Sequence, residues 1–488
     1  MTQPIIYWYR QDLRTADLPG LRAAVASDRP LIACYILDDL AAGEAAMGGA
    51  SRWWLHHSIE ALAAELKALG GTLVLRRGDT LRELSRLLQE TGADCVHCSR
   101  LYEPWANTQE ERLNESLESS GASIKRFPGS LLFEPDQVKN QSGAPFKVFT
   151  PFWRHCRFSQ PPSFPAAAPR DVRWYKGNLE SEALASWGLK PESPDWARHW
   201  PELWRPGSAG AEQRLRDFLA GPVMDYSEGR NHPAREACSR LSPHLHFGEI
   251  SPRAVWHAAR NLSDSKPDSA EQVDKFLSEL GWREFSHHLL YHFPTIDREP
   301  FKPQFRDFPW LGNEQALRAW QRGQTGYPIV DAGMRELWQT GYMHNRIRMV
   351  TASFLSKHLL VHWRAGARWF RDTLVDADLA NNSCGWQWVA GSGADASPYF
   401  RIFNPVIQGE KFDEHGDYIR RWVPELAMLP DRYLNKPWEA PAAVLEAAGV
   451  SLGKNYPQPV VDHKSARESA LAAYAALKAG DTQAAPPD

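Results

Sequence analysis

Short apolar runs alternate with helical patterns over about the first 130 residues of the chain. The apolar runs are IIYWY at 5–9, PLIACYIL at 30–37, GTLVLRRGD at 71–79 and ADCVHC at 93–98. Helical patterns such as RWWLHHSIEALAAELKAL at 52–69 lie between them. Strands that alternate with helices in this way form parallel sheets with right-handed crossovers. We therefore predict a Rossmann-like α/β domain at the N-terminus.

The pattern takes a helical period after about Glu202 and keeps it nearly to the end of the chain, for example at 272–293 and 334–360. Between the two halves the periodicity is lost, and prolines gather at 161, 162, 165, 169, 191 and 194, as expected of a linker. The predicted parts are an α/β domain at 1–130, an interdomain linker at 131–201, an all-α domain at 202–478 and a flexible tail at 479–488.

The composition excludes a membrane-spanning protein. Hydrophobic residues make up 43% of the 488 residues and charged residues 24%, and no apolar run approaches the roughly 20 residues that span a bilayer. Charges precede any long apolar stretch in the opening MTQPIIYWYRQDLR, which is untypical of a signal peptide. The six cysteines are scattered, and we interpret the one CxxC, Cys95 and Cys98, as structural. We expect a cytoplasmic protein with reduced thiols.

Charge and aromatic content both point to the second half of the chain. A net charge of −3 does not indicate a nucleic-acid-binding protein, but the segment 340–401 holds seven Lys or Arg against four Asp or Glu. The 21 tryptophans are an unusual number for a chain of this length. We expect some of them to serve redox or stacking chemistry. The single GxGxxA string, GSGADA at 391–396, lacks the strand–turn–helix context of a dinucleotide site, so we interpret it as coincidental.

Long motifs in the order of a known family extend over nearly the whole chain. They are WYRQDLR at 8–14, SRWWLHHS at 51–58, SRLSPHLHFGEIS at 239–251, ELGWREF at 279–285, TGYPIVDAGMR at 325–335, MHNRIRM at 343–349 and the block from Asp376 to Pro405. The chain resembles the photolyase and cryptochrome family, and most closely the photolyases that split cyclobutane pyrimidine dimers. The resemblance implies FAD in the helical domain and light-driven repair of damaged, mainly double-stranded DNA by a monomer. An electron from excited, reduced FAD would split a flipped-out dimer and then return.

The family pattern assigns residues to FAD. The residues at the diphosphate would be Tyr226, Cys238, Ser239, Arg240, Leu241 and Ser242, with Cys238 in place of a frequent threonine. The residues around the isoalloxazine ring and ribose would be Arg283, Arg348, Asp376, Asp378 and Asn382. Arg348 and Asp376 would form an ion pair against the ring, which burial tolerates only with good hydrogen bonding.

Asn382 stands where the family places a side chain facing the protonatable central nitrogen of the ring. A neutral amide accepts from N–H without adding negative charge, and plant cryptochromes carry aspartate there. The position therefore favours repair over the alternative, a cryptochrome-type photoreceptor with the same flavin pocket, as does the lack of a long C-terminal extension. A shift of one residue would transfer the role to Asn381.

Three tryptophans, Trp386, Trp363 and Trp310, match the family's electron-transfer chain from the surface to photoexcited, oxidised flavin. The lesion pocket would be formed by Glu279, Trp282, Asn345, Arg346, Met349 and Trp388. Glu279 counts among the predicted catalytic residues. Enzymes specific for (6-4) photoproducts carry histidine at the positions of Asn345 and Met349, which argues against that substrate. The phosphates beside the lesion would be held by Arg230, Arg346 and Arg401. A non-photochemical flavoprotein, a further alternative, leaves the lesion-pocket residues unexplained.

The sequence also bears on two further ligands, a metal ion and a second chromophore. His244, His246 and Glu249 form an HxHxxE string near His287 and His288, but spacing alone does not make a metal site, and we expect none. A second, antenna chromophore is expected in the α/β domain, either methenyltetrahydrofolate or 8-hydroxy-5-deazaflavin. SRWWLHHS resembles the class III branch near plant cryptochromes, and the Asn-Glu-Arg run that binds folate in some members is missing from 102–112, so both candidates stay open.

Overall fold

The computed structural model describes residues 2–119, 121–396 and 400–484. They form two compact units that interleave along the chain. Unit 1 comprises residues 1–224, 239–294 and 375–380, and unit 2 comprises residues 225–238, 295–374 and 381–488. Each unit is described by itself.

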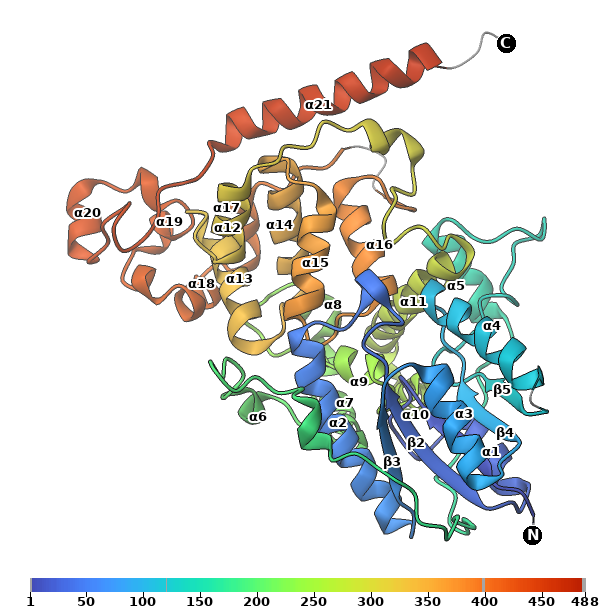
Figure 1. The fold of residues 1–488 in the computed structure, drawn as a ribbon. Helices are drawn as coiled ribbons and strands as arrows, with labels where there is room; N and C mark the ends of the chain where they lie inside the picture. Colours follow the sequence, from blue (N-terminus) through green and yellow to red (C-terminus); the bar gives the residue numbers. More distant parts are fainter. Residues whose placement is uncertain (1, 120, 397–399, 485–488) are drawn as a thin grey trace. The chain divides into compact units, whose positions relative to one another are not determined.

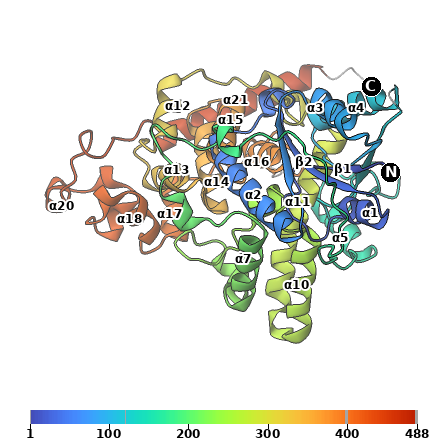
Figure 2. The same ribbon diagram turned by 60° about the horizontal axis from the view of Figure 1, so that its bottom comes forward.

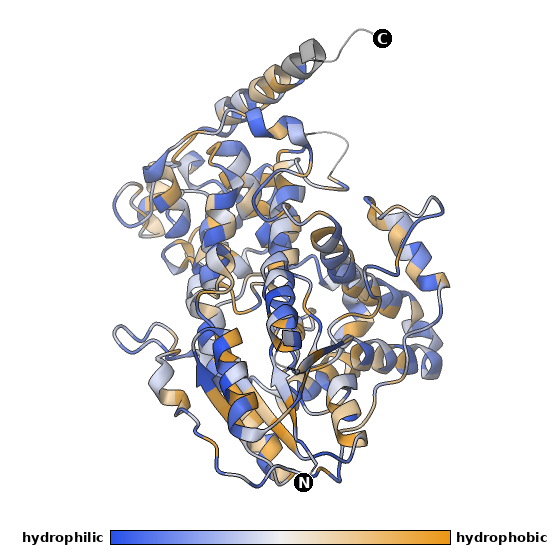
Figure 3. Cartoon of the chain, turned by 45° about the vertical axis from the view of Figure 1, so that its right-hand side comes forward, coloured by the Kyte–Doolittle hydropathy of each residue, from blue (hydrophilic) through white to orange (hydrophobic). Residues whose placement is uncertain are grey.

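A five-stranded, all-parallel sheet organises unit 1, with the strand order β3-β2-β1-β4-β5. Its strands are β1 (Ile5–Tyr9), β2 (Leu31–Leu37), β3 (Leu73–Arg77), β4 (Cys95–Ser99) and β5 (Ser123–Phe127). In the central strands Ile6 pairs with Ile32 on one side and Val96 on the other, and all three are buried. Figure 3 shows the strands mainly in the colour of hydrophobic residues, as expected for a sheet covered on both faces. The predicted parallel sheet is confirmed, and β5, whose sequence SIKRF is polar, is an edge strand that the apolar pattern missed.

Helices connect successive strands of this sheet (Figure 1). They are α1 (Pro19–Ala26), α2 (Gly49–Ala68), α3 (Thr80–Thr91) and α4 (Pro104–Ser119). The sequence fixes both ends of α3, because the Asp79 carboxylate accepts the backbone N–H of Arg82 and Gly92 closes the helix at a φ of 67°. Leu84, Leu87 and Leu88 of α3 pack into the core beside the sheet.

Further helices complete unit 1: α5 (Phe149–Phe158), α6 (Trp200–Leu203), α7 (Ser208–Ala220), α9 (Ser242–His246), α10 (Pro252–Ser265) and α11 (Ala270–His292). Figures 1 and 2 show α7 and α10 side by side. The loop after β1 binds the turn after α9, because Leu13 donates its N–H to the Phe247 carbonyl at 3.0 Å. Gly248 has a φ of 66°, and a Cβ there would lie 2.2 Å from the Gln11 carbonyl oxygen, so the close approach requires glycine. Helix α5 lies inside the segment predicted as a linker.

In the part of unit 2 that the structure describes, the regular elements are helices, apart from one isolated β-bridge between Leu452 and Tyr456. Its helices of six residues or more are α12 (Glu314–Gln321), α13 (Pro328–Thr340), α14 (Asn345–Ser353), α15 (Trp363–Thr373), most of α16 (Leu379–Ala390), α17 (Pro405–Phe412), α18 (Asp417–Trp422), α20 (Ala442–Ala447) and α21 (His463–Ala484). Its four-residue helices are α8 (Tyr226–Gly229) and α19 (Asp431–Leu434). The segment 334–360, which has a helical pattern, is divided between two helices, because Gly341 ends α13 at a φ of 68° and α14 starts after His344. Helix α14 then continues as a π-helical turn, η6 (Phe354–His358).

Helix α21 runs to Ala484, so residues 479–484 are helical where a flexible tail was predicted, and 485–488 lie outside the described residues. None of the six cysteines, all of which are described, forms a disulfide. Every helix in the described ranges is too short or too polar to cross a membrane. The predicted domain boundaries stay a prediction.

Candidate functional site

The turn that leads into α9 contains four of the predicted FAD ligands, residues 239–242, and brings Ser242 against a fifth, Asp376. Arg240 has a φ of 50°, a left-handed conformation that costs a non-glycine residue about 1 kcal/mol and often marks functional sites. Ser239 Oγ accepts the N–H of Leu241 at 3.4 Å. At the end of the turn, Ser242 Oγ donates to Oδ2 of the buried Asp376 at 2.6 Å. The turn thus places two serine hydroxyls near each other in the sequence, and one of them is bonded to a carboxylate.

Two histidines contact Asp378. They are His287 and His246, which the sequence places in or near the HxHxxE string that is not expected to bind metal. Its Oδ2 lies 3.3 Å from His287 Nε2 and 3.7 Å from His246 Nδ1. Burial alone would raise the pKa of Asp378, but His287 and His246 overcome it and hold the pKa well below its ordinary value. Burial opposes charging of His287 too, and the Asp378 charge still raises its pKa. Asp378 is therefore an ionised acceptor inside unit 1.

The other members of the HxHxxE string also have partners in the protein. His244 Nδ1 pairs with Glu249, and Trp54 Nε1 donates to the same carboxylate at 2.9 Å. In the described ranges, no group of three or more His, Cys, Asp or Glu side chains is arranged to hold a metal ion.

Arg283 is fixed on α11 by backbone carbonyls. Its Nη1 donates to the Ser130 carbonyl at 2.9 Å and its Nη2 to the Leu245 carbonyl at 3.5 Å. The neighbouring Glu284 accepts the N–H of Leu132 at 2.8 Å, and burial raises its pKa to about 7 against the influence of Arg283. The orientation of Arg283 is thus set by the fold of unit 1.

Two predicted lesion residues also lie on α11. Trp282 is partly exposed and stacks on Phe149 with ring centroids 3.7 Å apart and planes 9° apart. Glu279 is partly exposed and forms an ion pair with Lys275 at 3.6 Å. Stacking on Phe149 holds the Trp282 indole rigidly while part of it remains accessible.

Asn382 is oriented within unit 2 by a backbone carbonyl. Its Nδ2 donates to the Ala367 carbonyl of α15 at 2.9 Å. Oδ1 is the hydrogen-bond acceptor of this side chain, so it is the atom that would accept an N–H from a ligand. This orientation suits a ring N–H.

The remaining predicted FAD residues of unit 2 have local partners. Arg348 Nε donates to the Met343 carbonyl at 2.7 Å, and Cys238 Sγ lies 3.6 Å from His344 Nε2. Tyr226 is buried, with the Arg230 guanidinium 5.6 Å from its ring centroid. The predicted pair of Arg348 with Asp376 stays a prediction.

The three tryptophans of the predicted electron route lie in unit 2. Trp386 and Trp363 are buried, with exposed fractions of 3% and 1%, whereas Trp310 is partly exposed. Trp386 packs against Trp320, which the sequence did not single out, at 6.1 Å, and a Cβ at Gly366 would come within 2.0 Å of its ring. His362 lies 5.7 Å from Trp363 and 5.1 Å from Trp310, measured between ring centroids. Trp310 is thus the partly exposed member, as the surface end of the route requires, and the two inner members are both buried.

Three arginines predicted to hold phosphates are close together in unit 2. Burial lowers the pKa of Arg346, and the charges of Arg230 and Arg401 lower it further. Arg346 also donates to Asn231 Oδ1 at 2.6 Å, and its guanidinium lies 4.3 Å from the Phe412 ring centroid. Three guanidinium groups that repel one another are typical of a site for anions.

The other lesion residues of unit 2 have accessible side chains. On the same helix as Arg346, Asn345 is exposed and Met349 partly exposed. Trp388 of α16 is also partly exposed.

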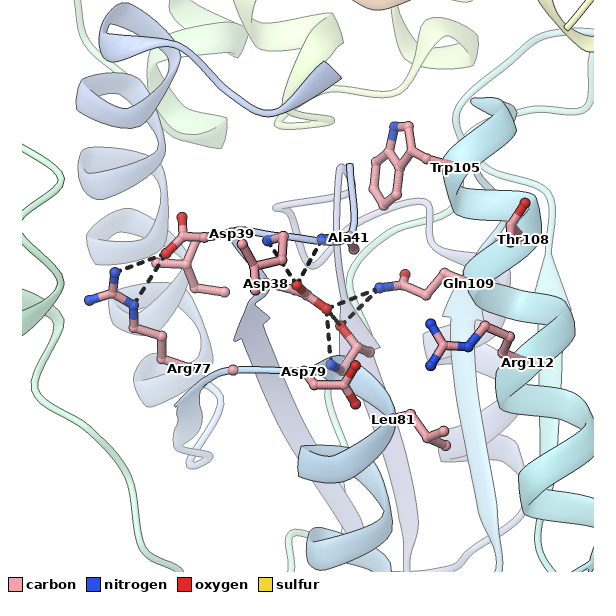
Figure 4. Close-up of a pocket in the computed structure, with 14 residues that line it drawn as sticks. Asp38, Asp39, Ala41, Arg77, Asp79, Leu81, Trp105, Thr108, Gln109 and Arg112 are labelled. Atoms are coloured by element: carbon pink, nitrogen blue, oxygen red, sulfur yellow. Dashed lines mark hydrogen bonds and ion pairs between the residues drawn. The ribbon is translucent and has the colours of Figure 1, made fainter. Parts of the chain in front are cut away.

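A pocket of about 690 Å³ opens at the carboxyl ends of β2 and β3 (Figure 4). Asp38, at its centre, accepts the N–H groups of Leu40 and Ala41 at 3.1 and 3.0 Å and the Thr80 hydroxyl at 2.9 Å. Trp105, Gln109 and Arg112 line it from α4, and Figure 4 shows their side chains on the side facing Asp38. Its volume suits a cofactor-sized ligand, and its lining combines an aromatic face with a guanidinium. A chromophore is predicted in this domain from the sequence, but no sequence motif indicates the residues of this pocket.

The chain is similar to known proteins in sequence and in fold. The family model described as DNA photolyase matches residues 5–170, and the model described as FAD binding domain of DNA photolyase matches residues 276–476. A deoxyribodipyrimidine photo-lyase from Agrobacterium fabrum is 52% identical over 477 residues, covering 98% of each chain. Cryptochrome-1 from Arabidopsis thaliana is 38% identical over 93% of this chain and 68% of its own. The solved structure of a class III photolyase from Agrobacterium tumefaciens has a TM-score of 0.94 at 51% identity, covering 98% of each chain.

The chain therefore belongs to the DNA photolyase family, in which photolyases and cryptochromes share one fold. The matches confirm the predicted family, the α/β plus all-α fold class, FAD as the cofactor and deoxyribodipyrimidine photolyase as the enzyme class. The predicted roles of individual site residues stay predictions.

Proposed function

We propose that this chain repairs cyclobutane pyrimidine dimers in double-stranded DNA, using light and bound FAD. The observation that carries the choice of repair over signalling is the neutral amide of Asn382, whose orientation by the Ala367 carbonyl leaves Oδ1 as the acceptor. Illumination of the reduced protein with dimer-containing DNA tests the proposal directly. The monomeric state and a cytoplasmic location remain predictions.

The residues present fit FAD by their chemistry. The serines and N–H groups of the turn at 239–242 suit an anionic diphosphate, and the ionised Asp378 suits a ribose hydroxyl. Bound FAD supplies, in its reduced and excited form, the electron that splits the dimer. The protein's own contribution is to bind, orient and shield: Arg283 and Asn382 are fixed by backbone carbonyls before any ligand arrives.

We propose that lesion recognition combines stacking with polar contacts. Trp282 and Trp388 would each stack on a damaged base, an interaction that contributes about 1–3 kcal/mol per base. Asn345 and Glu279 would bind the polar edges of the bases. Because Asn345 is exposed at the start of α14, its amide is accessible to a ligand.

Asn345→Ala is expected to weaken binding of dimer-containing duplex by about 1–3 kcal/mol, the cost of leaving a buried polar group without its partner. Undamaged duplex does not fill the pocket, so it should bind the variant and the parent protein alike. Titration of both duplexes, with FAD content measured alongside, checks this. Equal losses on damaged and undamaged DNA would place Asn345 outside the lesion pocket.

The cluster of Arg230, Arg346 and Arg401 is proposed to bind backbone phosphates, which fixes the register of the protein on DNA without reading sequence. Arg346→Gln is expected to weaken binding of damaged and of undamaged duplex. It should also reduce the slope of log affinity against log salt by about 0.9, one phosphate contact. Arg421→Gln, at an exposed arginine of α18, is the matched control and should leave the slope unchanged. An unchanged slope in Arg346→Gln would exclude a phosphate contact.

We propose that the pocket beside Asp38 holds the antenna chromophore. A flat ring system would stack on Trp105, and Arg112 would bind an acidic group, features that methenyltetrahydrofolate and a deazaflavin share. Trp105→Ala is expected to remove most of the antenna absorbance after reconstitution with either compound, while FAD content stays the same. Glu111→Ala, an exposed neighbour on α4 that does not line the pocket, should bind normally. Full antenna binding by Trp105→Ala would place the chromophore elsewhere.

A further inference from the structure

We propose that His362 is a positioning residue that holds Trp310 against Trp363 for electron transfer between the two indoles. The inference rests on the proposed tryptophan route and adds to it a residue that is neither oxidised nor reduced. An electron passes from Trp310 to oxidised Trp363, and a soluble thiol afterwards restores Trp310.

The His362 ring contacts both partners. Its centroid lies 5.1 Å from that of Trp310, with planes 53° apart, and 5.7 Å from that of Trp363, with planes 29° apart. Such distances are within the range of direct aromatic contact. The imidazole is thus packed against the two members of the proposed route that are farther from the flavin.

Trp310 depends on such contacts because it lies in a segment without regular structure, between η5 (Pro303–Asp307) and α12. Its ring rests on Phe308 at 4.4 Å and on His362. The next residue, Leu311, donates its N–H to the Leu360 carbonyl at 2.6 Å. Leu360 itself has a φ of 50°, which is unfavourable for a bulky side chain. The residue that binds the Trp310 segment, Leu360, therefore has a strained backbone, and it lies two residues before His362.

A histidine has an advantage over other aromatic side chains at this position, because a hydrogen bond to the backbone fixes the orientation of its ring. His362 precedes α15, and its Nδ1 accepts the N–H of Arg364 at 3.1 Å as a helix N-cap. The Nδ1 lone pair is used, so the neutral ring carries its proton on Nε2. Burial, together with Arg364 and Arg368, lowers the pKa of His362 to about 4. The ring therefore adds no positive charge beside an oxidised indole at neutral pH.

Two variants of His362 distinguish the effect of its aromatic ring from the effect of its N-cap hydrogen bond. His362→Asn keeps an oxygen that can cap α15 but removes the ring, whereas His362→Phe keeps the ring and removes the cap. The measured quantity is the rate of flash-induced electron transfer from Trp310 to Trp363 in protein that carries oxidised FAD. Transient absorption spectroscopy records this rate. Thermal unfolding of each variant is recorded in parallel.

We expect His362→Asn to slow this transfer about tenfold or more, because displacements near 1 Å already have large effects on reacting groups. His362→Phe should transfer at nearly the parent rate although it unfolds at a lower temperature. Normal transfer in His362→Asn, or equal slowing of both variants, would overturn the proposal. Trp363→Phe distinguishes a failure of the route itself: if that variant still reduces FAD in light, the route is wrong whatever the His362 variants do.

Discussion

Replacing Trp363 by phenylalanine is expected to abolish light-driven reduction of oxidised FAD, while repair by chemically reduced protein continues at nearly the parent rate. Trp363 is 1% exposed and starts α15, so phenylalanine preserves the apolar, aromatic character of the site. An indole is oxidised far more easily than a phenyl ring, so the substitution removes the relay without removing the packing. Repair does not use the relay, since there the electron goes directly to the dimer.

The measurement follows FAD absorbance under blue light with a thiol present, and separately follows repair after chemical reduction. Trp256→Phe is the matched control, because Trp256 is a buried tryptophan of unit 1 on α10. It should behave as the parent protein in both assays. A parallel loss of both activities in Trp363→Phe would make Trp363 a packing residue.

Asn382→Asp is expected to lower the yield of fully reduced FAD under light and to slow repair about tenfold or more, since a penalty of about 1.4 kcal/mol already corresponds to a factor of ten. Two effects act together. The Nδ2 donor to the Ala367 carbonyl is lost, so an ionised carboxylate would face that oxygen at the distance where an N–H stood. The new negative charge would also disfavour an anionic reduced ring by repulsion between like charges.

The neighbouring variant Asn381→Asp serves as the matched control, because it adds the same charge one position earlier on α16. FAD content, photoreduction yield and repair rate are compared for both variants. If Asn381→Asp shows the defects and Asn382→Asp does not, the ring-facing role belongs to Asn381.

Local pattern was sufficient for the central part of the α/β sheet. The apolar runs of β1 to β4 are short and buried, and helical patterns separate them. A parallel arrangement of these strands could therefore be predicted. Strand β5 was missed because an edge strand with Lys125 and Arg126 exposed has no continuous apolar run. The break between α13 and α14 could not be located from periodicity, because the helical pattern continues past Gly341, whose left-handed conformation ends α13.

The candidate site could be predicted only as far as side-chain types carry a signal. The motifs indicated Ser242, Asp376 and Asp378, and the fold brings Ser242 and Asp376 into contact. The role of His287 beside Asp378 depends on contacts between residues 91 positions apart in the sequence, which spacing does not reveal. The Ala367 carbonyl that orients Asn382 carries no sequence signal at all, since every residue has such a group.

The most direct measurement is illumination of the chemically reduced protein with duplex DNA that carries either a cyclobutane thymine dimer or a (6-4) photoproduct. Asn345 and Met349 offer an amide and a thioether, which are poorly suited to the proton transfer that (6-4) repair requires. We expect intact thymines to be restored from the cyclobutane dimer in light and not in the dark, and the (6-4) product to be unchanged. Failure to restore thymine in light, or efficient conversion of the (6-4) product, would contradict it.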